Sequence, residues 1–265
     1  MAIAGILILG LRRRRKAGTP LPQNAAVLLE THVAAYRALP PDARTAFLQR
    51  MKQFLSRIRV HGVGIPLEPL DIVLVAAGAV IPTWGFPEWT YNNLSDVLLY
   101  PEAFDQQHFA KEHENRHNTL GMVGSGAMER VMILSEPALR EGFPTQDPHG
   151  EGFHGGRSNT AIHEFVHLID KSDGAVDGIP EALLGDKVHA WTDLVHAYLG
   201  PVGSGHTDIN PYGGTNAAEF FAVVSEYYFQ RPDLMKEHHP DLFALLFHIF
   251  RYAPHLPQNS PPEPA

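Results

Sequence analysis

Cysteine is absent from the 265-residue chain. A chain without cysteine forms no disulfide and has no thiolate that could bind a metal ion or act as a nucleophile. Any metal site must therefore be built from His, Asp and Glu. The chain has 16 histidines, and we expect those outside a defined spacing to be surface residues.

Positive charge is also in short supply. Lys and Arg number 21 against 29 Asp and Glu, so the net charge is −8. This balance argues against a general nucleic-acid-binding protein. The share of hydrophobic residues, 44%, is ordinary for a globular protein. The length suffices for one large domain or two small ones, and no internal repeat is evident.

The chain lacks a long apolar run as well. Residues 2–11 are apolar and are followed at once by the basic residues 12–16. Ten residues are too few to cross a bilayer as a helix, and a secretory signal would carry its positive charges before the apolar run. A weak surface anchor, a shortened membrane helix and a flexible leader are the alternatives. We expect a cytoplasmic protein, or one associated with the cytoplasmic side of a membrane through residues 1–16.

The central motif of the chain lies between Asn159 and Asp170, which reads N-T-A-I-H-E-F-V-H-L-I-D. His163, Glu164 and His167 form the pattern H-E-x-x-H. Positions i and i+4 of a helix lie on the same face, so both histidines can reach one metal ion. Two neutral imidazoles suit Zn²⁺, and a carboxylate that is not a ligand can take a proton from metal-bound water. The pattern is typical of zinc peptidases.

The surroundings of the motif favour a helix. Asn159 or Thr160 can cap it, and no Pro or Gly interrupts the segment. The apolar residues around the two histidines are Ile162, Phe165, Val166 and Ile169. The alternative interpretation is an amphipathic core helix with two partly buried histidines and a charged Glu at its edge.

A catalytic zinc ion normally has three protein ligands and an open position for water. Glu219 is the strongest candidate for the third ligand, because it is a lone carboxylate near the start of a helix otherwise filled with Ala, Phe and Val. A buried, unpaired Glu is costly, and binding a metal ion removes that cost. The alternative is a first-turn Glu favoured by the helix dipole. Glu226 lies two turns further on the same face, where it could orient a ligand histidine.

Asp173 is a rival third ligand. Counted from His163, the chain reads H-E-x-x-H-x-x-D-x-x-D, which is similar to the metzincin spacing. That motif needs Gly where this chain has Asp170, because the chain must turn sharply after the helix. Asp173 is therefore the weaker candidate. We expect Asp170, three residues after His167, to orient a ligand through a hydrogen bond or to end the helix.

Apolar periodicity predicts an α+β fold that is mostly helical, with a small β-sheet beside the metal helix. We predict helices over 25–39, 41–60, 71–81, 159–170, 187–199, 216–230, 232–238 and 240–251, and strands over 97–100 and 130–135. Residues 1–24 are expected to be a leader and linker, and residues 254–265 a disordered Pro-rich tail.

Four connecting segments bear on function. Residues 105–118 contain clustered His and Glu, which we interpret as a solvated loop in preference to a second metal site. Residues 121–126 are Gly-rich but lack the phosphate-loop pattern. The strand over 130–135 could pair with an extended peptide, which would add to the sheet as an edge strand. Residues 144–157 form a long Gly/Pro loop before the metal helix, and such loops are often mobile.

Three sequence stretches together resemble a known family. They are A-I-H-E-F-V-H-L-I-D, the following D-G-x-x-D-G-I-P, and a later Tyr212 followed by A-A-E-F-F-A-V-V-S-E-Y-Y-F. This combination is similar to the Mlc titration factor A family of zinc-dependent peptidases. The likeness covers most of the chain from Leu39 to Tyr252, and its specific motifs lie between Asn159 and Phe229.

The resemblance implies a single zincin-like catalytic domain over residues 25–253, with a gluzincin-type site. It implies His163, His167 and Glu219 as zinc ligands, Glu164 as general base and Tyr212 as a hydrogen-bond donor in the transition state. His206 could assist Tyr212 in stabilising the oxyanion.

The resemblance also implies an activity and partners. Family members are described as cytosolic aminopeptidase-like enzymes that also bind a glucose-responsive transcriptional repressor. A peptide or protein substrate and a repressor are therefore the expected partners. The second hypothesis is of another class: a protein-binding regulator whose metal site is structural or vestigial.

Overall fold

The computed structural model describes residues 18–102, 121–123, 129–143 and 159–252. The predictions for the N-terminal leader, the His-rich segment 105–118, the loop 144–157 and the tail 254–265 lie outside the described residues.

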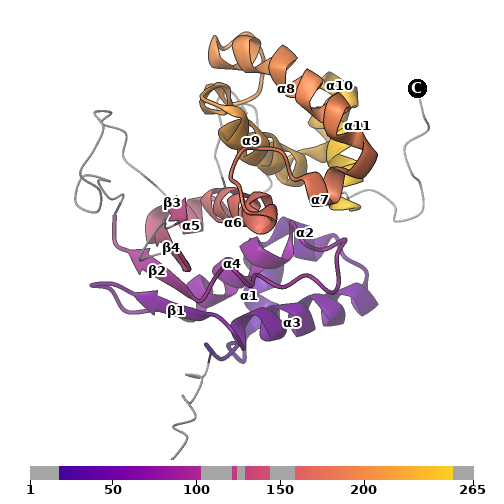
Figure 1. Ribbon diagram of the computed structural model, residues 1–265. Helices are drawn as coiled ribbons and strands as arrows, with labels where there is room; N and C mark the ends of the chain where they lie inside the picture. The colour runs from indigo at the N-terminus through magenta and orange to yellow at the C-terminus, as the bar shows by residue number, and fades with distance from the viewer. Residues whose placement is uncertain (1–17, 103–120, 124–128, 144–158, 253–265) are drawn as a thin grey trace, which may run out of the picture.

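Helices make up most of the described chain (Figure 1). They are α1 (Ala25–His32), α2 (Ala34–Arg37), α3 (Pro41–Leu55), α4 (Pro69–Val80), α5 (Glu136–Glu141), α6 (Thr160–Asp170), α7 (Glu181–Leu184), α8 (Val188–Gly203), α9 (Ala217–Gln230), α10 (Pro232–His238) and α11 (Pro240–Phe250). Short 3₁₀ helices are η3 (Lys171–Asp173), η4 (Gly185–Lys187) and η5 (Pro211–Gly214). With the small sheet described next, this confirms the mostly helical α+β fold.

The sheet has the strand order β1-β2-β4-β3. Its strands are β1 (Arg59–Gly62), β2 (Asp96–Tyr100), β3 (Gly121–Val123) and β4 (Val131–Ser135). β1, β2 and β4 are parallel, whereas β3 runs antiparallel to β4. The hypothesis that residues 130–135 accept a peptide as an edge strand is wrong, because β4 pairs with β2 on one side and β3 on the other. Among the described strands, β3 and β1 form the two edges.

Two predicted helices are shorter than expected. The helix predicted over 41–60 ends at Leu55, and the residues that follow form β1. Pairing of β1 with β2, with Val60 beside Val97, replaces the helical continuation. The helix predicted over 25–39 is interrupted at Val33, whose backbone is extended (φ −117°, ψ 98°). These boundaries depend on tertiary contacts, which local periodicity does not contain.

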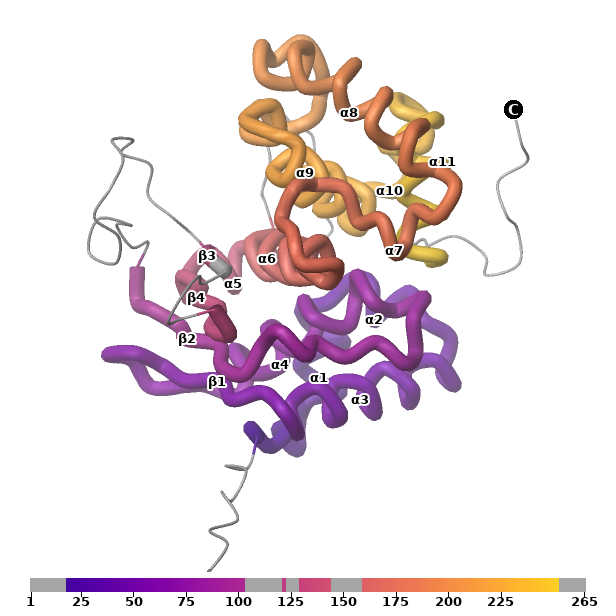
Figure 2. Tube along the Cα trace, in the orientation of Figure 1, coloured from indigo at the N-terminus to yellow at the C-terminus, as the bar shows by residue number. Residues whose placement is uncertain are grey.

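Helix α6 lies in the middle of the molecule. In the orientation of Figures 1 and 2, α1–α4 lie below it, the sheet lies to its left and lower left, and α7–α11 lie above it. All of its residues are buried, and it packs against α9, α4 and β3. The approach of α4 is close because a Cβ atom on Gly78 would lie only 2.7 Å from Cβ of Ala161. A helix enclosed in this way presents fixed side chains to its neighbours.

Helix α4 is strongly apolar, and it begins with a capping box. Glu68 and Asp71 each accept a hydrogen bond from the other's backbone N–H, and Pro69 occupies the first turn. The helix has 12 residues. No helix within the described ranges is both long and apolar enough to cross a membrane.

Candidate metal centre

The start of α6 is fixed by a side-chain cap. The backbone N–H of Ile162 donates to Oδ1 of Asn159 over 3.0 Å. The Asn159 amide in turn donates to the carbonyl of Gly142 over 2.8 Å, which anchors the cap to the end of α5. Of the two predicted caps, Asn159 is therefore the one in use. The anchored helix places His163 and His167 on one face.

Helix α9 brings two carboxylates to that face. Asn216 caps α9 by accepting the N–H of Glu219 over 2.9 Å. Glu219 and Glu226 are two turns apart, and both reach the same imidazole. Oε2 of Glu219 lies 3.0 Å from Nε2 of His163, and Oε1 of Glu226 lies 2.6 Å from Nδ1 of that residue. The predicted common face of the two glutamates thus points at α6.

Three side chains converge on one point. Nε2 of His163 and Nε2 of His167 are 3.1 Å apart, and Oε2 of Glu219 lies 3.0 Å from the former and 3.6 Å from the latter. A tetrahedral zinc ion with bonds of about 2.0–2.2 Å holds neighbouring ligand atoms about 3.3–3.6 Å apart. The observed spacing of the ligand atoms, all within 4.8 Å of one another, therefore fits a single zinc ion.

The electrostatics of this group favour a cation. Burial opposes charge on Glu219, but hydrogen bonds with His163 and His167 outweigh it and lower the pKa of Glu219 far below its usual value. Burial likewise opposes charge on His163, yet hydrogen bonds to Glu219 and Glu226 raise its pKa well above the usual value. The carboxylates thus make positive charge favourable between the imidazoles, and a metal ion supplies such charge.

Glu164 lies next to this group and is 5% exposed. Burial raises the pKa of Glu164, although the charges of His163 and His167 act in the opposite direction. The backbone of β3 passes close to its carboxylate: a Cβ atom on Gly121 would lie 2.5 Å from Oε1 of Glu164. Sequence reasoning missed this role of Gly121. The Gly-rich run over 121–126 is evident in the sequence, but its spacing does not indicate a contact with α6.

Tyr212 lies at the open side of the group. It belongs to η5, whose start is held by Asn210, the acceptor of the Tyr212 N–H over 3.0 Å. The Tyr212 and His163 rings have centroids 6.0 Å apart, and Tyr212 is 50% exposed. Partial burial and the nearby carboxylates of Glu219 and Glu164 raise the pKa of Tyr212. Its hydroxyl therefore stays protonated at neutral pH and able to donate.

Comparison with known proteins agrees with this geometry. Residues 9–251 match the family described as glucose-regulated metallo-peptidase M90. The chain belongs to this family. Uncharacterized protein slr2042 of Synechocystis is 25% identical over 89% of this chain and 86% of its own length. Mlc titration factor A of Escherichia fergusonii is 28% identical over 84% of this chain and 85% of its own length. The protein of the same name from Pectobacterium atrosepticum is 28% identical over 76% of this chain and 76% of its own length. The family resemblance is therefore confirmed.

Membership of the M90 metallopeptidases implies a bound metal ion. Among the described residues, His163, His167 and Glu219 form the group of three that could hold one. Asp173 is not part of it. Asp173 is exposed in η3, where its carboxylate accepts the N–H of Ala175 over 3.3 Å.

Two further residues considered for the M90 site have other contacts. Nδ1 of His206 is 2.6 Å from Oγ of Ser204, within its own exposed loop. Asp170 is fully buried and accepts the N–H of Gly178 over 2.8 Å, so it holds the turn after α6. Its Oδ1 atom and Nδ1 of His167 are both buried with no hydrogen-bond partner in the described part of the chain. Burial raises the pKa of Asp170 to about 6.

Proposed function

We propose that this M90 metallopeptidase is a zinc-dependent enzyme that hydrolyses peptide bonds. His163, His167 and Glu219 hold the metal ion. Glu164 is the general base, and Tyr212 donates a hydrogen bond to the developing oxyanion. One observation carries the proposal: two imidazole nitrogens and one carboxylate oxygen lie within 4.8 Å of one another.

The donor set favours zinc over other metals. Two imidazoles with one carboxylate, in a chain without thiolates, are a ligand set that catalytic zinc commonly uses, whereas Mg²⁺ and Ca²⁺ prefer oxygen ligands. When bound, zinc lowers the pKa of a coordinated water and polarises the substrate carbonyl. Glu226 holds Nδ1 of His163 over 2.6 Å and so presents Nε2 toward the metal position.

Glu164 moves the protons. Its carboxylate accepts a proton from the attacking water and delivers it to the leaving amine, and the raised pKa of Glu164 makes it a better acceptor. The Tyr212 hydroxyl donates to the carbonyl oxygen as negative charge develops there. The raised pKa of Tyr212 keeps its hydroxyl protonated at neutral pH, as this role requires.

Strand β3 is the place where a substrate backbone can align. It is an edge of the described sheet and packs against α6. An extended peptide can add to such an edge through backbone hydrogen bonds, and next to Gly121 its carbonyl would lie close to Glu164. A peptide N-methylated at residues flanking the cleaved bond should be turned over more slowly than its parent. Equal rates would contradict pairing with β3.

The decisive experiment removes the base and keeps the metal. Glu164→Gln should lower turnover of a peptide substrate by about 10²–10⁴-fold while zinc content stays that of the wild type. Asp173→Asn is the matched control, because it makes the same acid-to-amide change outside the group. Turnover by Glu164→Gln equal to that of the wild type would contradict the proposed role of Glu164.

The family resemblance favours aminopeptidase action. Alanine p-nitroanilide and its N-acetylated form distinguish the two modes of cleavage. An aminopeptidase hydrolyses only the form with a free amine. Equal hydrolysis of both forms would indicate that the free amine is not recognised.

The alternative function is regulatory. The relatives from Escherichia fergusonii and Pectobacterium atrosepticum carry the name Mlc titration factor A. On this alternative, the chain binds a transcriptional repressor and its metal site has a structural role. Chelation followed by peptide turnover and far-UV circular dichroism separates the two functions. If chelation abolishes peptide turnover and the fold stays intact, the result supports the enzyme. If the zinc-loaded protein shows no turnover and unfolds when zinc is removed, the result supports the regulator.

A further inference from the structure

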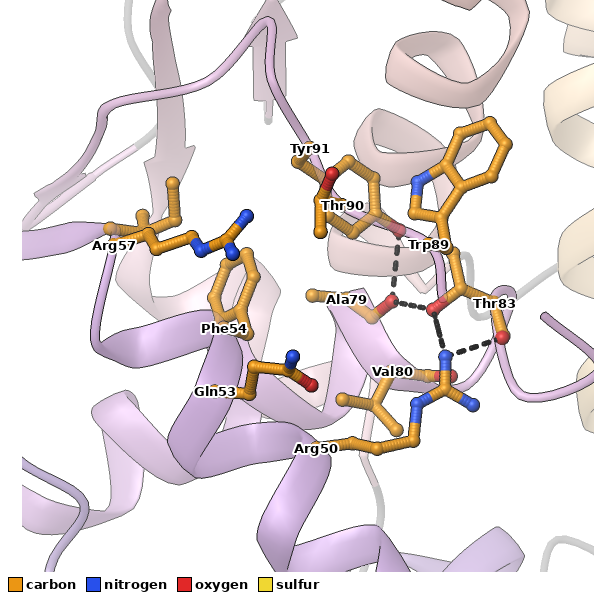
Figure 3. A pocket seen from close by; sticks show the side chains of 11 residues that line it. Arg50, Gln53, Phe54, Arg57, Ala79, Val80, Thr83, Trp89, Thr90 and Tyr91 are labelled. Carbon is orange, nitrogen blue, oxygen red and sulfur yellow. Dashed lines mark hydrogen bonds between the residues drawn. The ribbon is translucent and has the colours of Figure 1, made fainter. Parts of the chain in front are cut away.

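A pocket lies on the far side of α6 from the metal ligands, between α3, the end of α4 and residues 89–91 (Figure 3). Its walls are formed partly by Phe54 of α3 and by Tyr91. Both rings contact Phe165 of α6, with centroids 5.6 and 5.1 Å away. Phe165 follows Glu164 directly. The pocket is therefore separate from the metal centre but shares its helix.

Two hydrogen-bond donors in this pocket lack partners. Nε1 of Trp89 is buried and donates to no atom of the described chain. Arg57 is exposed at the rim, and its guanidinium forms neither a hydrogen bond nor an ion pair with the described residues. Figure 3 shows Arg57 and Trp89 on opposite sides of the pocket. The Trp89 nitrogen has no surface open to solvent, so the Arg57 guanidinium is the donor that a ligand in the pocket can reach.

The pocket is positively charged in an acidic protein. Arg50 forms its floor, and its guanidinium donates to the carbonyls of Thr83, Trp84 and Phe86 over 2.5, 2.8 and 3.0 Å. These acceptors are neutral. No Asp or Glu lines the pocket, although the chain carries a net charge of −8. Two guanidinium groups without a carboxylate favour an anionic ligand.

The wall of the pocket is rigid and mostly apolar. Tyr91 donates its hydroxyl to the carbonyl of Ala79 over 2.8 Å, so the phenol is already engaged. Phe54, Ile58 and Val80 supply apolar surface. The space open to the centre of a water molecule is about 40 Å³, and one water needs about 10–15 Å³. The pocket therefore accommodates a small head group and not a large cofactor.

We propose that this pocket binds a small organic carboxylate with a short apolar body. The carboxylate pairs with the Arg57 guanidinium, with the Gln53 amide as a further donor at the rim, and the Trp89 indole lies on the opposite side of the pocket. The apolar body packs against Phe54 and Tyr91. A carboxylate has about four lone-pair positions and pairs well with a guanidinium. A phosphate needs more donors than this pocket offers.

The Trp89 indole provides a direct probe of binding. The chain has three tryptophans, so a ¹H–¹⁵N spectrum contains three indole N–H signals, and Trp89→Phe identifies one of them. Titration with 3-methylbutanoate should move the Trp89 signal in a saturable way, with a dissociation constant on the order of a millimolar. The uncharged isostere 3-methylbutanamide should move it much less.

Variants decide whether the binding is specific. Arg57→Gln should weaken 3-methylbutanoate binding by about tenfold or more, because it removes a charged hydrogen bond. Lys52→Gln is the matched control: it removes one positive charge from the exposed face of α3 outside the pocket, and should leave the dissociation constant unchanged. The proposal is overturned if acid and amide move the Trp89 signal equally, if Arg57→Gln binds like the wild type, or if the signal does not move.

Discussion

Helix α6 has two neighbours at the metal centre, and they present opposite surfaces to it. Helix α9 presents charge: the carboxylates of Glu219 and Glu226 lie 3.0 and 2.6 Å from the two ring nitrogens of His163. Strand β3 presents bare backbone, because any Cβ on Gly121 would lie 2.5 Å from Oε1 of Glu164. The α9 side therefore orients the imidazoles, and the β3 side leaves the Glu164 carboxylate free to move a proton.

This division of roles separates two measurable quantities. Changes on the α9 side should alter the affinity for metal, because they act on His163. Changes on the β3 side should alter turnover while the metal stays bound, because they act on Glu164. A substitution that lowered metal affinity and peptide turnover equally would contradict this division of roles.

The largest effect is expected on the β3 side. Gly121→Ala places a methyl group against the Glu164 carboxylate and displaces it. A displacement of about 1 Å at a catalytic group can cost about 10²-fold in rate, so we expect peptide turnover to fall to that extent with zinc content unchanged. Met122→Ala is the control, because adjacent strand residues point to opposite faces. Normal turnover by Gly121→Ala would show that β3 does not confine Glu164.

On the α9 side, Glu226→Gln should weaken zinc binding by about 10–100-fold. The amide can still accept a hydrogen bond from Nδ1 of His163 but carries no charge to increase the basicity of the imidazole. Competition with a fluorescent zinc chelator measures the affinity. Glu181→Gln, on the exposed surface of α7, makes the same change away from the site. Unaltered zinc affinity of Glu226→Gln would show that His163 needs no charged partner.

The smallest effect is expected at Asp170, which ends α6 and accepts the N–H of Gly178. Burial raises its pKa from 3.8 to about 6 in the folded protein. Between these values the folded state keeps a proton that the unfolded state releases, so the stabilising contribution of this proton is full at low pH and is lost as pH rises through about 6.

The comparison of wild type with Asp170→Asn isolates this titration. From below pH 3.8 to above pH 6, the unfolding free energy of the wild type should fall relative to that of Asp170→Asn, by about 1 kcal/mol and by no more than about 3. Denaturant unfolding at matched zinc loading measures it. Asp186→Asn, on the exposed surface of η4, should show no such trend relative to the wild type. A wild type that becomes more stable than Asp170→Asn as pH rises would contradict the argument.

Short-range rules explain what the sequence predicts well. The caps Asn159 and Asn216, the uninterrupted apolar faces of α6 and α9, and the i and i+4 spacing of the histidines all act within one helix. Glu219 and Glu226 share a face for the same reason. Only the structure shows that this face is directed toward α6. Tyr212 entered only through the family resemblance, because nothing in its surrounding sequence marks it as part of a site.

Long-range contacts explain what the sequence did not predict. Strand β1 exists because Val60 pairs beside Val97. Strand β4 lies inside the sheet because it pairs with β2, 35 positions earlier in the chain (131 − 96 = 35), as well as with β3. Gly121 meets Glu164 across 43 positions of sequence (164 − 121 = 43). The pocket between Arg57 and Trp89 is assembled from three separate segments. Hydrophobic periodicity carries no information on such pairings.

The central claim is that Glu219 completes the metal site that His163 and His167 begin. Elemental analysis of purified wild type, Glu219→Ala and Asp173→Ala tests it most directly. The account predicts one zinc ion per chain in the wild type and in Asp173→Ala, and loss of zinc in Glu219→Ala with the fold retained by circular dichroism. Full zinc content in Glu219→Ala, or its loss in Asp173→Ala, would contradict the claim and move the third ligand elsewhere.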